Sequence, residues 1–182
     1  LLSRLSDLAP VCFVNGNHEM CVERHQPERY QKFMDDLKNG GVQVLHNETA
    51  WFWIDGEKVA VTGYELPWEY YRRFSRRHPS VVGMERSIGK RKQDAYQILL
   101  THNPVFFEEY AAWGADFTFA GHLHGGFIRL PYFGGVISPQ FQLFPKYDHG
   151  LYQMDTSSMV VGAGMGNHSG LFRINNPTEI VT

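Results

Sequence analysis

At three places in the chain, a short apolar segment runs directly into a polar loop rich in Gly, Asn or His. The segments and their loops are Val11–Val14 with Asn15–Glu19, Tyr96–Thr101 with His102–Pro104, and Asp116–Ala120 with Gly121–Gly126. Short apolar runs bounded by turn residues are typical of buried strands. Ligand sites in α/β folds gather at the carboxyl ends of strands. The pattern therefore predicts an α/β fold in which the three loops meet at one crevice.

The remaining segments alternate between helical and strand patterns, without an internal repeat. Helices are predicted at Leu1–Leu8, from Pro27 to the Asn39-Gly40-Gly41 stop, at Trp68–Arg77, and from Phe106 to Gly114. Further strands are predicted at 42–45, 50–54, 59–62, 150–154 and 158–161, with Asp55-Gly56 as a hairpin turn. The length suits one domain, so residues 1–182 are predicted to form a single unit of α/β (α+β) class.

Composition and charge narrow the classes of protein to which the chain can belong. Apolar residues make up 43% and charged residues 20%, as in a globular domain. The formal net charge of −2 gives no basic field, so binding of nucleic acid is not expected. The apolar runs are far shorter than the roughly 20 residues that span a bilayer. With only Cys12 and Cys21 there is no disulfide framework, which favours a reducing compartment; Cys12 is expected to be buried and Cys21 to lie in a loop.

His122-Leu123-His124 is the first candidate for metal chemistry. On an extended segment, two residues at this spacing point to the same side. Neutral imidazole is a common ligand of zinc, iron, manganese and copper. Gly121, Gly125 and Gly126 around the pair allow a tight turn close to a ligand. The alternative is a pair of turn histidines that bond only to backbone.

Asn17, His18 and His102 extend this candidate set. The carboxamide oxygen of Asn17 can bind a cation without adding charge, and His18 can donate a proton or a hydrogen bond to a developing anion. His102 lies where a strand becomes a loop. The alternatives are a simple Asn-Gly-Asn turn and a partly solvated strand-end histidine. Taken together, the residues provide the mixed oxygen and nitrogen donors of a metal site.

Three motifs in this order, Gly16-Asn17-His18-Glu19, Thr101-His102-Asn103-Pro104 and Gly121-His122-Leu123-His124-Gly125-Gly126, resemble those of the calcineurin-like metallophosphoesterase family. The stretches Arg129–Gly135, Gly162–Gly166 and Pro177–Ile180 resemble its bacterial phosphohydrolase branch, some members of which are membrane-associated. The resemblance implies a four-layer α/β/β/α sandwich. Phe127 stands where the bacterial branch often has Gln, a change expected to alter a pocket wall rather than remove a ligand.

The resemblance also implies the chemistry of the site. Asn17, His102 and His122 would bind one metal ion, His124 would bind a second, and His18 would assist at the phosphate or the leaving group. The cofactors would be two divalent transition-metal ions, Mn, Fe or Zn. They would polarise the phosphoryl oxygens and activate a water, whose hydroxide attacks phosphorus in line with the leaving oxygen. The implied activity is hydrolysis of a phosphoric mono- or diester.

Two further family motifs, an Asp-x-His and a Gly-Asp-x-x-Asp, do not occur in a matching context in the sequence. The resemblance places them upstream, with two core strands, so the domain is expected to be incomplete at its N-terminus. The 182 residues alone are then expected to be a weak catalyst or an inactive one. One alternative is a non-catalytic metal-binding scaffold that acts through a partner. Another is a zinc hydrolase acting on a non-phosphate bond. This alternative ranks last because the sequence has no H-E-x-x-H pattern.

Partners and location are less constrained. The substrate is expected to be a phosphorylated small molecule or lipid, and the sequence does not fix the oligomeric state. Two basic clusters could contact anionic lipid headgroups, although solvated surface is the favoured interpretation; they are Arg72, Arg73, Arg76 and Arg77, and Lys90, Arg91 and Lys92. A bacterial protein in the cytoplasm or at the membrane periphery is expected. His168 is a less favoured addition to the site, and Trp51, Trp53 and Trp68 are expected to pack rather than to line an entrance.

Overall fold

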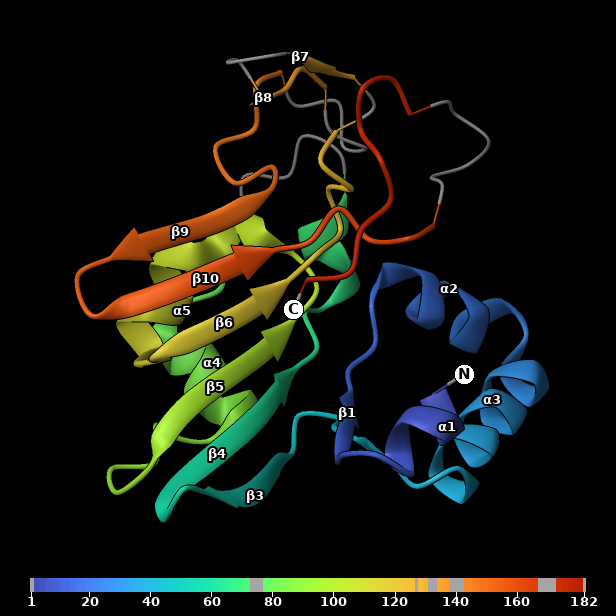
Figure 1. Cartoon of the computed structure of the whole chain (residues 1–182), viewed down its shortest axis with the longest axis vertical. Helices are drawn as coiled ribbons and strands as arrows, with labels where there is room; N and C mark the ends of the chain where they lie inside the picture. Colours follow the sequence, from blue (N-terminus) through green and yellow to red (C-terminus); the bar gives the residue numbers. More distant parts are fainter. Residues whose placement is uncertain are drawn as a thin grey trace.

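The computed structural model describes residues 2–72, 77–126, 128–130, 134–137, 143–166 and 173–181. A six-stranded sheet forms the centre, with strand order β3-β4-β5-β6-β10-β9 (Figure 1). Its strands are β3 (Thr49–Ile54), β4 (Glu57–Tyr64), β5 (Tyr96–Thr101), β6 (Phe117–Ala120), β9 (Gly150–Met154) and β10 (Ser157–Val161). The four inner strands run parallel, and β3 and β9 are antiparallel to their neighbours. The carboxyl ends of β4, β5, β6 and β10 therefore lie at one edge.

A second sheet packs beside the first and has two parallel strands among the described residues, β1 (Val11–Phe13) and β2 (Val42–Val44). Three helices accompany it: α1 (Leu2–Ser6), α2 (Asn17–His25) and α3 (Pro27–Asn39). Helix α3 buries Tyr30, Met34 and Leu37 against Val42 and Val44. The apolar positions of α3 thus fall on one face, as the sequence spacing predicts.

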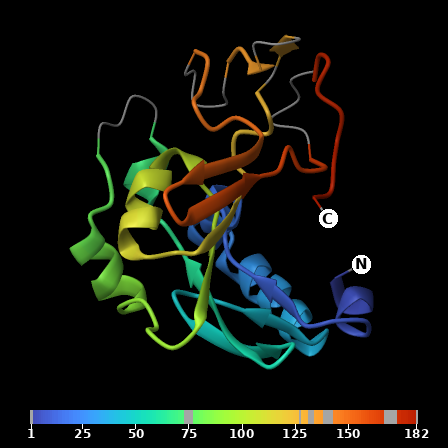
Figure 2. The ribbon, with the colours of Figure 1, turned by 60° about the vertical axis from the view of Figure 1, so that its left-hand side comes forward.

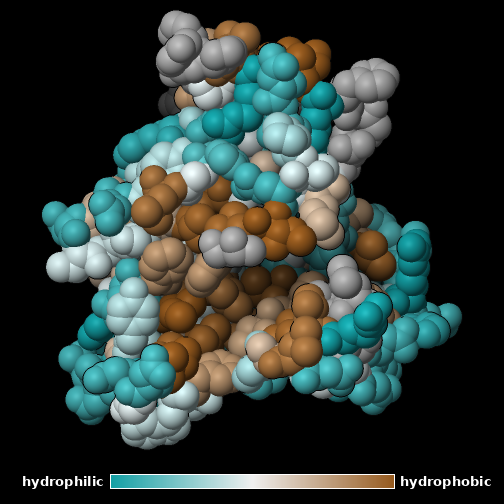
Figure 3. Space-filling view, viewed as in Figure 1, coloured by the Kyte–Doolittle hydropathy of each residue, from teal (hydrophilic) through white to brown (hydrophobic). Residues whose placement is uncertain are grey.

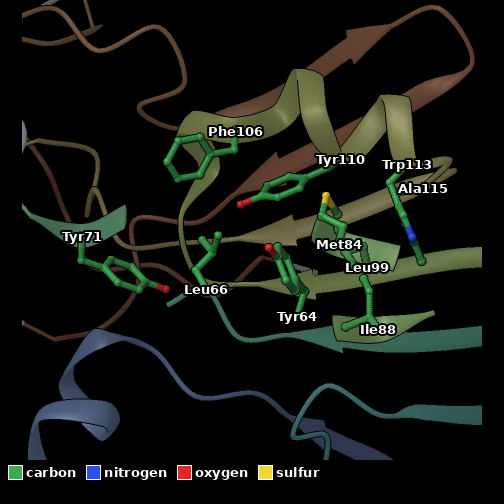
Figure 4. Close-up of a cluster of buried hydrophobic side chains, with 10 residues drawn as sticks. All are labelled: Tyr64, Leu66, Tyr71, Met84, Ile88, Leu99, Phe106, Tyr110, Trp113 and Ala115. Carbon is green, nitrogen blue, oxygen red and sulfur yellow. The ribbon is translucent and has the colours of Figure 1, made fainter. Parts of the chain in front are cut away.

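The opposite face of the large sheet is covered by α4 (Val81–Ile88), α5 (Phe107–Trp113) and two short 3₁₀ helices, η1 (Trp68–Tyr71) and η2 (Pro104–Phe106) (Figure 2). Their side chains form the largest apolar core together with those of β4 and β5 (Figure 4). Tyr110 and Leu99 are fully buried there, and the rings of Tyr64 and Tyr110 meet edge to face at 6.3 Å. This packing holds the loops after β4 and β5 against a rigid support.

The layers run helix, sheet, sheet, helix. Leu45, Ala50, Val59 and Val61 form a core next to the second sheet, with Cys12 packed against it. The predicted α/β class is confirmed. A further two-stranded ribbon, β7 (Arg129–Leu130) with β8 (Gly134–Gly135), lies beyond the carboxyl edge of the large sheet (Figure 1).

Two parts of the local prediction are wrong. Residues 17–25 form α2, so Cys21 is an exposed helical residue and not a loop residue. The polar composition of α2 gives no apolar periodicity from which a helix could be predicted. The carboxylate of Glu19 accepts from the Gly16 N–H at 2.9 Å and so caps the start of the helix. The helix predicted at Trp68–Arg77 ends at Tyr71, and Arg72 has extended backbone angles. Residues 73–76 of the predicted helix lie outside the described residues.

An apolar groove of about 500 Å³ opens between the two sheets. Its walls come from both sheets; the lining side chains are Pro10, Cys12, Phe52, Trp53, Ile54, Val61, Ile98, Leu100 and Phe119. The space-filling view shows this face as a continuous apolar surface (Figure 3). Burial there raises the pKa of the Cys12 thiol, in agreement with its expected role as an apolar side chain. Across the described ranges, no helix is both long and apolar enough to cross a bilayer.

Candidate metal centre

The three predicted loops meet at one end of the two sheets. Asn17 and His18 open α2 just after β1, and His102 directly follows β5. His122 and His124 follow β6, which pairs in parallel with β5. The imidazole rings of His102 and His122 lie 5.1 Å apart between centroids, at an angle of 62°. The side chains that follow β5 and β6 are therefore neighbours, as expected for the predicted crevice.

Gly16 brings the first loop against His102. A Cβ added at Gly16 would lie 2.8 Å from Cδ2 of the His102 ring, closer than unbonded carbons approach. The backbone angles of Gly16 are extended (φ −99°, ψ −174°), so the position needs a small residue and not an unusual conformation. The absence of a side chain at Gly16 thus sets how closely Asn17 and His102 approach each other.

The carboxamide oxygen of Asn17 has no hydrogen-bond donor in the described part of the chain, although the atom is buried. A buried polar atom without a partner costs free energy and needs an explanation such as an ion. A carboxamide oxygen is a suitable ligand for a hard or borderline cation. The Asn17 oxygen could therefore accept a cation as its partner.

His102 is neutral at physiological pH. Its pKa is lowered to about 4, mainly by burial and to a smaller extent by charge repulsion from His124 and His18. His122 is 7% exposed, and its ring meets the Tyr71 ring edge to face at 5.2 Å. Metal ions bind the neutral form of imidazole. The environment of His102 therefore favours the protonation state that a ligand requires.

The segment His122-Leu123-His124 is not extended, which corrects the sequence-based prediction. Both histidines have left-handed backbone angles, with φ of 63° and 50°. The Leu123 N–H donates to the Gly121 carbonyl and the Gly126 N–H to the Leu123 carbonyl, both at 2.7 Å. Two successive tight turns explain the angles. Strained non-glycine residues of this kind cluster at functional sites.

Two residues of the C-terminal segment hold this loop, and sequence reasoning missed both. The side-chain amide of Asn176, which is 4% exposed, donates to the carbonyls of His124 and Gly126. The Arg173 guanidinium donates to Nδ1 of His124 at 3.3 Å and to the Ala163 carbonyl at 2.8 Å. Both lie about 50 positions from the loop. Only the resemblance of nearby Pro177–Ile180 to the bacterial branch drew attention to this segment.

His18 is exposed on the first turn of α2. Its charge contributes to the lowered pKa of His102, so His18 lies near that ring. The remaining described histidines, other than exposed His25, have carboxylate partners elsewhere: His46 with Glu65, His78 with Glu109, and His149 with Glu179, at 2.7–2.8 Å.

In the two basic clusters, Arg91 donates to both carboxylate oxygens of Asp116, and Arg77 lies 3.7 Å from Glu69. His168, Phe127, Arg73 and Arg76 lie outside the described residues.

The donor set fits one divalent ion better than two. Asn17, His102 and His122 offer one oxygen and two imidazole nitrogens from three different loops. Nδ1 of His124 already accepts from Arg173. Within the described ranges, no group of three or more His, Cys, Asp or Glu side chains is compact enough to hold a metal ion. Asn17 is thus essential to the set, and further ligands are needed for a second ion.

Comparison with known proteins gives several relatives. The metallophosphoesterase YkuE of Bacillus subtilis is 29% identical over 82 residues, covering 45% of this chain and 28% of YkuE. The phosphodiesterase YaeI of Escherichia coli is 24% identical over 180 residues, covering 99% of this chain and 60% of YaeI. The B. subtilis protein YpbG is 30% identical over 129 residues, covering 69% of this chain and 42% of YpbG. No solved structure gives a significant match.

The chain spans less than two thirds of the length of each of these relatives. Residues 1–126 match the sequence model of the family described as calcineurin-like phosphoesterase. That range contains all three motif loops and the five residues that the sequence singled out. With the helix-flanked sheets and the crevice at their carboxyl edge, this match shows that the chain belongs to the calcineurin-like phosphoesterase family.

Proposed function

We propose that this crevice is the metal-binding half of a phosphoesterase site that hydrolyses a phosphoric mono- or diester. The observation that supports the proposal most directly is the buried, unpartnered carboxamide oxygen of Asn17 beside the paired rings of His102 and His122. Family membership supports phosphoesterase chemistry at a general level. The names of YkuE and YaeI agree with it.

Each residue has a distinct role in this proposal. Asn17, His102 and His122 hold one divalent ion, and His124 holds a second. Divalent transition-metal ions such as Mn, Fe or Zn polarise phosphoryl oxygens and lower the pKa of a bound water. His18, exposed at the mouth of the crevice, donates a proton or a hydrogen bond to the leaving oxygen. For His124 to become a ligand through Nδ1, the Arg173 contact must open.

We further propose that acidic ligands come from polypeptide outside these 182 residues. The support is the lack of a compact His, Cys, Asp or Glu cluster within the described ranges. A carboxylate contributes charge that Asn and neutral His do not, so the isolated chain should bind metal weakly. Its turnover should then be low compared with that of a longer protein containing an Asp-x-His and a Gly-Asp-x-x-Asp.

The test is hydrolysis of bis(p-nitrophenyl) phosphate and p-nitrophenyl phosphate with added manganese, by the chain and by a longer form that includes upstream residues. We expect metal-dependent turnover in the longer form, lost on chelation and at least 100-fold lower in His122→Ala. Lys32→Ala is the control, since Lys32 lies exposed on α3, where its ammonium contacts Asp36. Turnover that survives both chelation and His122→Ala would show the proposal to be wrong.

The second candidate function is a metal-binding scaffold without catalysis. The contact of Arg173 with Nδ1 of His124 favours it, because this contact occupies one of the two ring nitrogens that could bind a second ion. Metal counting in the longer form separates the two. Two manganese ions per chain exclude the scaffold with a half-site, whereas one ion without turnover supports it.

A further inference from the structure

A second hollow opens beside the candidate metal centre, between helix α2 and η1. It has a volume of about 290 Å³ and is lined by Met20, Cys21, Glu23, Arg24, His25 and Trp68. Trp68 remains 43% exposed although it faces this hollow. Neither the family motifs nor the ligand set described above includes any of these six residues.

Two observations place the hollow near the candidate metal centre. On one side, Met20 and Cys21 follow one turn after Asn17 and His18 on the same helix. On the other side, the Trp68 ring lies 6.4 Å from that of Tyr71, which in turn lies 5.2 Å from that of His122. A small ester with its phosphorus near the imidazoles could therefore place its alcohol group in the hollow.

The lining favours one kind of group. Trp68 offers an indole face and Met20 a thioether, and both contact planar aromatic rings favourably. The Arg24 guanidinium can stack on such a ring or contact a polar substituent at its edge. The volume suits one or two rings and is too small for a long acyl chain. An acyl chain would also leave the polar side chains at the rim, Glu23, Arg24 and His25, without a hydrogen-bond partner.

We propose that the hollow between α2 and η1 binds a planar aromatic group of the phosphoester substrate, with Trp68 and Met20 as its specificity-determining residues. The inference rests on the proposed function for the position of the phosphate. It assigns the substrate class as aryl or nucleobase-bearing phosphoesters rather than lipid phosphates.

Binding of two phosphonates tests the inference without requiring turnover. Phenylphosphonate and methylphosphonate share the anionic group and differ in the ring, and their dissociation constants can be measured by calorimetry with and without manganese. We expect phenylphosphonate to bind at least tenfold more tightly. Trp68→Ala and Met20→Gln should remove this preference and leave methylphosphonate binding unchanged, whereas Trp68→Phe should retain most of it.

Trp51→Ala is the matched control, because Trp51 is 46% exposed on β3, away from the hollow. Circular dichroism establishes that each variant is folded, and Trp68→Phe keeps the test usable if Trp68→Ala is not. A phenyl preference that persists in Trp68→Ala, or that falls equally in Trp51→Ala, overturns the inference, as does failure of phenylphosphonate to bind.

The two proposals fail in different ways. Tight, Trp68-dependent binding of phenylphosphonate in a longer form without metal-dependent hydrolysis supports the aromatic site and contradicts the phosphoesterase proposal. Metal-dependent hydrolysis without a preference for the phenyl group supports the phosphoesterase and contradicts the aromatic site.

Discussion

At the scale of single residues, the candidate centre combines burial with unmet bonding capacity. His102 is kept neutral by burial, and the Asn17 oxygen is buried without a donor among the described residues. The unpartnered oxygen costs stability in the metal-free chain, and a bound cation would relieve that cost. Local destabilisation is therefore the expected consequence of a site shaped for an ion.

His102 should make the stability of the metal-free chain depend on pH. Its pKa falls from 6.5 to about 4 on folding, so the unfolded chain binds more protons between these values. The free energy of unfolding is therefore unaffected by His102 above pH 6.5 and decreases as the pH falls towards 4, by roughly 3 kcal/mol at most. Urea unfolding at pH 7, 5.5 and 4.5 measures it. The fall in the free energy of unfolding with decreasing pH should be smaller in His102→Asn and unchanged in His25→Asn. An equal fall in both variants would contradict the role given to His102.

The sequence predicted the residues of the crevice better than their supports. Asn17, His102 and His122 come together as expected because each follows a short strand, and strand ends fix positions. Their roles as ligands, and that of His18 in proton transfer, remain predictions. Arg173 and Asn176 could not be predicted, because they reach His124 through folding of a distant segment without a local pattern.

At the scale of elements, predictability followed local signals. The Asp55-Gly56 hairpin is confirmed, and both residues have positive φ, as that turn requires. Strand β5 was predicted with its observed bounds, since its centre, Ile98–Leu100, is apolar and a polar loop follows Thr101. Helix α2 was missed because its start depends on Glu19 capping rather than on apolar periodicity. Helix α4 was also missed; Ser80 caps it by accepting from the Gly83 N–H.

The C-terminal segment should act as a brace for the loop after β6. Asn176→Ala removes the donor to two backbone carbonyls, so the free energy of unfolding should fall by about 1–3 kcal/mol. Amide hydrogen exchange of Leu123–Gly126 should also become faster. Thr178→Ala, at an exposed position of the same segment, is the control and should change neither quantity. Unchanged exchange in Asn176→Ala would mean that the loop keeps its shape without the brace.

At the scale of the whole molecule, the apolar groove between the sheets is the dominant surface feature (Figure 3). Among the described residues, β1 pairs only with β2, so its other backbone edge has no strand partner there, and its Cys12 side chain lines the groove. An apolar face beside an open strand edge favours pairing with another chain. The isolated chain should therefore associate with itself as its concentration rises.

Phe119→Gln should reduce this association, since Phe119 is 43% exposed in the groove. Sedimentation velocity should show a shift towards monomer, with weaker fluorescence of an added apolar dye. Leu151→Gln, at a 62% exposed position on β9 outside the groove, tests whether any exposed apolar residue has the same effect. Identical behaviour of the two variants would show that the groove is not the source.

The same groove bears on the fate of the chain inside a living cell. Chaperones and proteases recognise exposed apolar surface, even on a protein whose remaining structure is correctly folded. The amount of this polypeptide recovered after expression should thus depend less on its melting temperature than on how quickly another polypeptide covers the apolar groove after synthesis.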